Sequence, residues 1–124
     1  MTDIRIAVPS MGEEGLEGLR SAHFGHCDSF VLVDIKNGKI DSVELLPNVE
    51  HSEGGCLVPV RLLAGHNVTA IIVSGMGLRP LAGFQNEGIN VYYDGENARV
   101  SEAVEAFMAG TLTLMKPEHT CGGH

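Results

Sequence analysis

The chain has 124 residues and a mass of 13.2 kDa, and 44% of its residues are hydrophobic, so we expect one domain with a core of its own. Sixteen acidic residues against eight Lys and Arg give a net charge of −8, which disfavours binding to nucleic acid. No apolar run approaches the ~20 residues of a membrane span, no signal-peptide pattern is visible, and three cysteines are too few for a disulfide framework. We therefore expect a cytoplasmic protein that binds neither membranes nor nucleic acid.

Apolar segments with strand character predict five β-strands, and segments with helical periodicity predict three helices. The strands are expected at residues 4–8, 30–35, 39–46, 68–73 and 89–93, and the helices at 57–64, 78–87 and about 100–109. Pro9 is expected to end the first strand, and Asn37-Gly38 predicts a tight hairpin. Ser101 is expected to cap the last helix and Gly110 to end it. A hairpin joined to alternating helices and strands predicts one α/β domain with a mixed sheet between helices.

The connection between Pro9 and Asp28 shows no sustained periodicity over roughly twenty residues. Loops longer than about 12–15 residues without secondary structure are uncommon in compact domains, where they usually carry function. This connection also contains the densest group of metal-ligating residue types. We therefore place a candidate site in it.

The first candidate group is His23-Phe24-Gly25-His26-Cys27, directly before the second strand. Imidazole and thiolate hold soft and borderline metals, and a turn at Gly25 would bring the ligands together. The spacing is not that of a strict zinc site. It is equally compatible with a structural loop in which Phe24 anchors the core and Cys27 is a small buried hydrophobe.

A second group lies in the last six residues, where His119, Cys121 and His124 are accompanied by two glycines. These soft ligands suit a mobile metal clamp, although a disordered end of accidental composition gives the same pattern. We accordingly expect an α/β domain over residues 1–112 and a flexible His/Cys tail over 113–124.

Two glycine-containing loops precede predicted helices. In one, Gly54 and Gly55 precede Cys56, whose pKa a helix N-terminus would lower; an inert buried cysteine is equally compatible. In the other, Ser74-Gly75-Met76-Gly77 follows the central strand, at the end where open α/β sheets bind ligands. Such turns are common, so this signal is weak alone. Asp34 and Asp94 are interpreted as turn formers or solvated carboxylates, and no catalytic motif is visible.

In combination, these segments resemble the dinitrogenase iron–molybdenum cofactor biosynthesis proteins. The resemblance spans roughly residues 4–110 and depends on Ile-Ala-Val-Pro at 6–9, Ser-Ala-His-Phe-Gly at 21–25, Gly-Gly at 54–55 and Ala-Ile-Ile-Val-Ser-Gly-Met-Gly at 70–77. It implies a ribonuclease-H-like α/β/α fold with a five-stranded mixed sheet. Members of this family carry or insert preformed metal–sulfur clusters, and the related orange protein of sulfate reducers holds a molybdenum–copper–sulfur cluster.

The resemblance implies a non-catalytic carrier of a metal–sulfur cluster of Fe–Mo–S or Mo–Cu–S type. It would work in an anaerobe with cluster-donating and cluster-accepting proteins. The His-Phe-Gly loop of the family corresponds to His23, Phe24 and Gly25, and His23 is implied as a cluster contact. The expected cofactor-binding residues are His23, Phe24, Gly25, His26, Cys27, Gly54, Gly55, Cys56, Ser74, Gly75, Met76 and Gly77. The expected metal ligands are His23, His26, Cys27, His119, Cys121 and His124.

Such clusters are anionic, whereas this chain is acidic, so binding would depend on local donors. The candidates are the loop amides at 54–56 and 75–77, the protonated imidazoles of His23 or His26, and Arg20 or Arg79. An alternative is a zinc or copper metallochaperone, or a metal-dependent interaction module, that uses the His-x-Cys-x-x-His tail. A nuclease is disfavoured by the charge and by a first strand without an acid over 4–8. We expect a monomer or a weak dimer.

Overall fold

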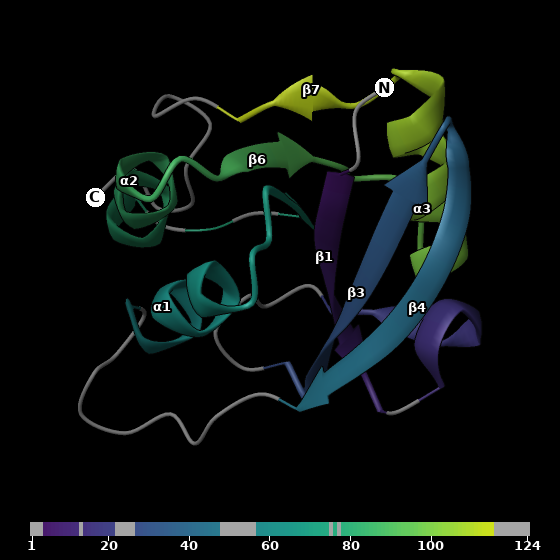
Figure 1. The fold of residues 1–124 in the computed structure, drawn as a ribbon, viewed down its shortest axis with the longest axis horizontal. Helices are drawn as coiled ribbons and strands as arrows, with labels where there is room; N and C mark the ends of the chain where they lie inside the picture. The colour runs from purple at the N-terminus through teal and green to yellow at the C-terminus, as the bar shows by residue number, and fades with distance from the viewer. Residues whose placement is uncertain are drawn as a thin grey trace.

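The structure, a computed structural model, describes residues 4–12, 14–21, 27–47, 57–74, 76 and 78–115. Within these residues a seven-stranded sheet lies between helices (Figure 1). The strands are β1 (Ile4–Met11), β2 (Leu19–Arg20), β3 (Ser29–Lys36), β4 (Lys39–Pro47), β5 (Ala70–Val73), β6 (Asn90–Tyr93) and β7 (Thr113–Leu114). The helices are α1 (Leu57–Gly65), α2 (Leu78–Asn86), α3 (Val100–Ala109) and a short 3-10 helix, η1 (Gly15–Glu17).

The sheet is mixed, in the order β4-β3-β1-β5-β6-β7, and β2 pairs with the end of β1 outside this order. β1, β5 and β6 are parallel, whereas β3 is antiparallel to β1, β4 to β3, and β7 to β6. The three parallel strands therefore end on one side of the sheet, which we call its carboxyl end. By the same pairing, β4 ends there and β3 begins there.

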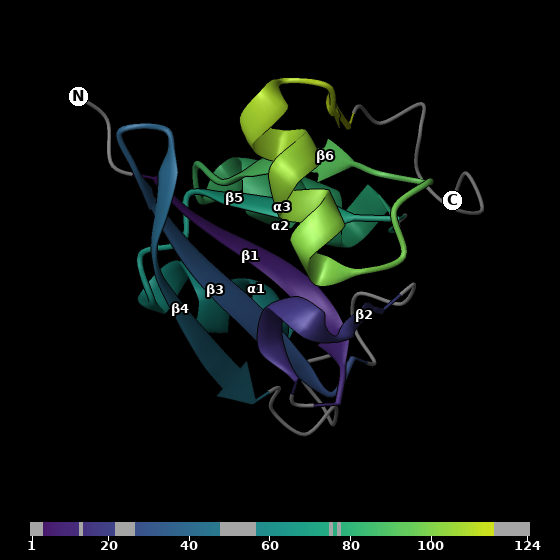
Figure 2. The same ribbon diagram turned by 90° about the vertical axis from the view of Figure 1, so that its right-hand side faces the viewer.

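Two apolar cores fill the spaces between the sheet and its helices. α1 and α2 lie on one face, where Leu63 and Phe84 pack in one cluster with Ile71. α3 lies on the other face, where Val100 and Val104 are buried in a second cluster (Figures 1 and 2). The three-layer α/β/α arrangement predicted from the sequence is therefore present. Among the residues that the structure describes, no helix is long and apolar enough to cross a membrane.

All five predicted strands and all three predicted helices are found, but the sheet formed by the described residues has seven strands rather than five. The two additional strands, β2 and β7, are only two residues long, which is too short to show a period in the sequence. The long connection after Pro9 is likewise not structureless, because it contains η1 and β2. At the other end of the chain, β7 pairs with β6 and Met115 is buried, so residues 113–115 belong to the sheet and not to a tail.

Pro9 does not end β1 as expected, because the strand continues to Met11. The carbonyl oxygen of Pro9 accepts a hydrogen bond from the backbone N–H of Ser21, which follows β2. The backbone nitrogen and oxygen of Pro9 therefore both point away from β3. A residue in this orientation needs no N–H to pair with β3, and the proline removes no hydrogen bond of that ladder.

The Asn37-Gly38 hairpin is confirmed, with φ of 55° and 75° at its two turn residues. The predicted N-cap of the last helix is wrong: α3 begins at Val100, so Ser101 lies inside its first turn. Glu102 takes over part of the capping role, because its carboxylate accepts a 3.3 Å hydrogen bond from the backbone N–H of Arg99. Gly110 ends the helix with a φ of 77°, as predicted.

Candidate functional site

The segments that flank the three predicted loops meet at the carboxyl end of the sheet. Cys27 precedes β3, while Ser74 and Met76 follow β5, the parallel neighbour of β1. β4 ends at the same side, and α1 begins beyond the segment that follows it. The strand directions therefore place the bases of these loops at one end of the sheet, with β3 and β1 between β4 and β5. This is the end at which open α/β sheets bind ligands.

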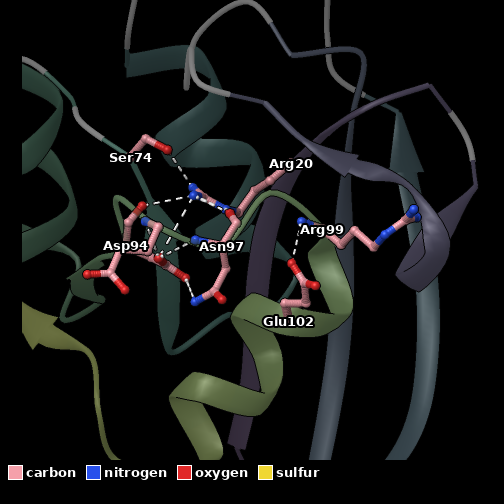
Figure 3. A network of polar contacts seen from close by, with 7 residues as sticks. Arg20, Ser74, Asp94, Asn97, Arg99 and Glu102 are labelled. Carbon is pink, nitrogen blue, oxygen red and sulfur yellow. Dashed lines mark hydrogen bonds and ion pairs between the residues drawn. The ribbon is translucent and has the colours of Figure 1, made fainter.

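Arg20 crosses this end of the sheet from β2 and joins it to the residues that follow β5 and β6 (Figure 3). Its Nη1 donates a 2.6 Å hydrogen bond to Ser74 Oγ. Its Nη2 donates to the backbone oxygens of Asp94 at 2.9 Å and Asn97 at 2.6 Å, and its Nε donates to the same Asn97 oxygen at 2.9 Å. The Arg20 side chain is only 5% exposed. The guanidinium is thus a buried positive charge at the carboxyl end.

Asp94 forms the turn against which Arg20 packs. Its Oδ1 accepts hydrogen bonds from the backbone N–H groups of Glu96 and Asn97 at 2.9 and 3.1 Å, and its Oδ2 accepts one from Asn97 Nδ2 at 2.8 Å. Burial alone would raise the pKa of Asp94, but these hydrogen bonds and the charge of Arg20 hold the pKa below its ordinary value. Asp94 is therefore a turn former, as the sequence suggested, but it is a buried one.

The two ends of the long connection are fastened to each other. Ser29 Oγ donates to the backbone oxygen of Gly12 at 2.8 Å, and Asp28 Oδ2 accepts from the backbone N–H of Gly12 at 2.8 Å. The hydroxyl groups of Ser10 and Ser29 lie 2.9 Å apart inside the protein. These bonds close the base of the connection at the carboxyl end, directly beside Cys27.

Two sulfur-containing residues lie beneath this end of the sheet. Cys27 is 5% exposed and Met76 is 4% exposed, and both belong to the core that α1 and α2 cover. Burial raises the pKa of the Cys27 thiol to about 12. Of the two interpretations that the sequence left open for Cys27, the structure favours a small buried hydrophobe. A role as metal ligand would require a metal to displace a firmly held proton.

Three of the predicted site residues are described by the structure, namely Cys27, Ser74 and Met76, and all three lie at the carboxyl end. The remaining predicted residues lie outside the described residues; they are His23, Phe24, Gly25, His26, Gly54, Gly55, Cys56, Gly75, Gly77, His119, Cys121 and His124. Within the described part of the chain, no three potential metal ligands come together.

Sequence reasoning named Arg20 as a possible donor but missed the residues that hold it. Asp94 and Asn97 are 74 and 77 residues away along the chain. The only local signal was the Asp-Gly-Glu-Asn sequence at 94–97, in which Asp and Gly favour a turn. Nothing in that signal pointed to an arginine in β2.

Comparison with known proteins gives a family and a set of similar folds. The family model described as dinitrogenase iron-molybdenum cofactor matches residues 3–110. An uncharacterised protein of Methanocaldococcus jannaschii, MJ0580, is 33% identical over 94 residues, which cover 74% of this chain and 79% of that protein.

Two solved structures show the same fold. The apo form of the orange protein from Desulfovibrio gigas has a TM-score of 0.79 and 28% identity, and the match covers 90% of this chain and 92% of that one. The MJ0327 protein of Methanocaldococcus jannaschii has a TM-score of 0.75 and 21% identity, with 94% and 98% of the two chains covered. At that identity the second likeness concerns the fold alone.

Proposed function

Because the chain belongs to the dinitrogenase iron–molybdenum cofactor family, we propose that it is a non-catalytic carrier of a metal–sulfur cluster in cluster biosynthesis or delivery. The cargo is a cluster of Fe–Mo–S or Mo–Cu–S type. The observation that carries the proposal is that the three loop bases lie at the carboxyl end of the sheet, where the buried guanidinium of Arg20 contacts Ser74. The likeness to the orange protein supports it.

The electrostatics of the carboxyl end suit an anionic cargo better than the net charge suggests. A charge of −8 repels anions at long range, but that repulsion is screened beyond about 10 Å in physiological salt. A buried guanidinium acts at short range in a medium of low dielectric constant, where each interaction is stronger. Hydrogen-bond donors at this end can therefore outweigh the acidity of the rest of the chain.

In this proposal His23 contacts the cargo, and His26, Cys56 and the glycine amides of the loops at 54–56 and 75–77 complete the site. Cys27, with a thiol pKa of about 12, contributes as a ligand only if the cargo displaces its proton. The tail residues His119, Cys121 and His124 close over the cargo or pass it to a partner protein. Cluster-donating and cluster-accepting proteins in the cytoplasm are the proposed partners, and the carrier is a monomer or a weak dimer.

The ribonuclease-H-like label belongs to the same proposal. It is supported by the order of the five long strands, in which β1, β3 and β4 form an antiparallel meander and β5 and β6 follow in parallel on the other side of β1. Nuclease activity is not part of the proposal, since no group of three acidic or other metal-binding side chains occurs in the described ranges.

The variant His23→Ala tests the site. We expect it to lower the affinity for tetrathiomolybdate, measured by equilibrium dialysis under anaerobic conditions, without changing the circular dichroism spectrum. The matched control is His66→Ala, because His66 lies after α1 at the opposite end of the sheet, with its ring Nδ1 2.9 Å from the Leu62 carbonyl oxygen. If His23→Ala binds as the unmodified chain does, the assignment of His23 is wrong.

The alternative function is a zinc or copper metallochaperone, or an interaction module, that uses the tail. It is favoured by the His-x-Cys-x-x-His spacing at 119–124. Deletion of residues 117–124 separates the two functions. Under the alternative the deletion abolishes metal binding, whereas under the carrier proposal it only reduces cluster retention.

A further inference from the structure

The hydrogen bond between Arg20 and Ser74 determines whether the serine hydroxyl can donate or accept a further hydrogen bond. A hydroxyl has one proton and two acceptor lone pairs. Arg20 Nη1 can only donate, so at 2.6 Å it occupies a lone pair of Ser74 Oγ and leaves the hydroxyl proton to be donated elsewhere. A positively charged donor also polarises the O–H bond, because hydrogen bonds in a chain strengthen one another. Ser74 is therefore set up as a strong donor.

The position of Ser74 makes this donor available to a ligand. Ser74 is the first residue after β5 at the carboxyl end, and the residue as a whole is only half-buried. The side chain of Arg20, its hydrogen-bond partner, is nearly fully buried. In Figure 3 the Ser74 hydroxyl lies against the Arg20 guanidinium, at the end of the sheet where we propose that the cargo binds.

Among the residues that the structure describes, Arg20 makes no direct hydrogen bond to a carboxylate, although it forms a buried ion pair with Asp94. The nearest carboxylate oxygen among its described partners is Asp94 Oδ1, at 4.0 Å, and the carboxyl group of Asp94 already accepts three other hydrogen bonds. Arg5 gives the contrast, because it forms a two-fold contact with Asp34 at 2.7 and 3.2 Å. Arg20 instead directs its hydrogen-bond donors at carbonyl and hydroxyl oxygens, so its direct effect on Ser74 is exerted through the hydrogen bond between them.

We propose that the Ser74 hydroxyl donates a hydrogen bond to the anionic cargo, and that Arg20 is the positioning residue that orients and polarises this hydroxyl. The ligand class is an oxo- or thio-anion, with the terminal sulfide or oxide of a metal cluster as the acceptor. Arg20 acts through Ser74 and does not touch the ligand. This inference rests on the proposed carrier function and adds a specific contact to it.

The test compares Ser74→Ala with Ser74→Thr, using tetrathiomolybdate as the probe and equilibrium dialysis as the measurement. Alanine removes the donor and threonine keeps it, so we expect Ser74→Ala to lose about 10- to 100-fold in affinity and Ser74→Thr to stay within a few-fold of the unmodified chain. Equal binding by Ser74→Ala and the unmodified chain overturns the proposal. A loss as large for Ser74→Thr as for Ser74→Ala overturns it as well.

The role of Arg20 is tested by Arg20→Met and Arg20→Lys. A polarising charge predicts that Arg20→Lys recovers part of the affinity that Arg20→Met loses, and that Ser74→Ala costs less affinity in the Arg20→Met background than in the unmodified chain. A merely structural brace predicts that Ser74→Ala costs the same in both backgrounds, and that result contradicts the inference. Should Arg20→Met fail to fold, the Ser74 pair and Arg20→Lys decide the question.

The same binding measurements show whether an error lies in the role of Ser74 and Arg20 or in the carrier function itself. If the unmodified chain binds no thiomolybdate at all, the carrier function falls and the inference falls with it. If the unmodified chain binds and Ser74→Ala binds equally well, the carrier function stands and only the role of Ser74 and Arg20 is wrong.

Discussion

Arg20 donates a 2.6 Å hydrogen bond to the hydroxyl of Ser74, a residue 54 positions further along the chain. The same guanidinium holds the backbone of Asp94 and Asn97, so one side chain joins β2 to the ends of β5 and β6. A planar guanidinium presents several donors at once, which is why one arginine can hold all of these groups. The guanidinium of Arg20 therefore fixes the backbone and the serine hydroxyl that lie next to the candidate site.

Replacing Arg20 should destabilise the fold strongly. Arg20→Met leaves the carbonyl oxygens of Asp94 and Asn97 buried without this donor, and we expect a loss of about 2–4 kcal/mol in the free energy of unfolding. The matched variant Arg5→Met removes a more exposed arginine, whose pair with Asp34 is 29% and 27% exposed, and should cost about 1 kcal/mol. Urea denaturation of both variants gives the comparison. A smaller loss for Arg20→Met than for Arg5→Met would contradict the supporting role.

Asp34 should contribute to acid sensitivity. The hydrogen bond from Arg5 is the main reason that the pKa of Asp34 lies below its ordinary value, and Ser42 donates a further bond at 2.8 Å. Because the folded-state pKa is below the unfolded value of about 3.9, the stabilisation is complete above that pH and is lost as the pH falls through the folded-state pKa. We expect Asp34→Asn to flatten the fall of unfolding free energy between about pH 5 and pH 2.

The control for this pH dependence is Asp41→Asn. Asp41 pairs with Lys36 at 3.7 Å, and both side chains are about half exposed, at 50% and 49%. Such a pair contributes little, so Asp41→Asn should leave the acid transition nearly unchanged. A slope for Asp34→Asn equal to that of the unmodified chain would show that the Arg5–Asp34 pair is not formed in solution.

Cys27 should be chemically inert in the folded protein. A thiol with a pKa of about 12 stays protonated near neutral pH, and the residue is 5% exposed. In a chain with Cys56→Ser and Cys121→Ser, we expect iodoacetamide to modify Cys27 at least about 100-fold more slowly in the folded state than in urea. Mass spectrometry over time measures both rates, and similar rates would mean that Cys27 is an accessible, reactive thiol.

Gly38 offers a test that separates stability from binding. Its φ of 75° is strained for any side chain, although an added Cβ would meet no atom within 4 Å. Gly38→Ala should therefore lower the free energy of unfolding by about 1 kcal/mol through backbone strain alone. The hairpin lies at the end of the sheet opposite the candidate site, so thiomolybdate affinity should not change. A change in affinity would place the ligand elsewhere.

The elements with strong local signals were predictable. Short stretches of sequence were enough to predict three features: the Asn37-Gly38 turn, the buried strand β5 and the apolar stripe of α3. Pro9 misled the prediction because its effect depends on which neighbour its missing N–H would face, and that is a property of the assembled sheet. β2 and β7 depend wholly on their partners, since two residues have no period of their own.

The candidate site was predictable only as a set of residue types. The strand order places Cys27, Ser74 and Met76 at one end of the sheet, the end at which the sequence predicted ligand binding for the 74–77 turn. The sequence could not show that Cys27 is a buried thiol, because burial depends on how α1 and α2 cover the sheet. It also could not pair Arg20 with Ser74, since the contact depends on the path of the whole chain between them.

Anaerobic reconstitution of the purified protein with thiomolybdate, iron and copper tests the carrier function most directly. After desalting, visible absorption and elemental analysis report what the protein has kept. We expect retained colour, with molybdenum and sulfide in stoichiometric amounts to the chain. A colourless protein that holds neither, or that holds only a single zinc or copper ion, would contradict it.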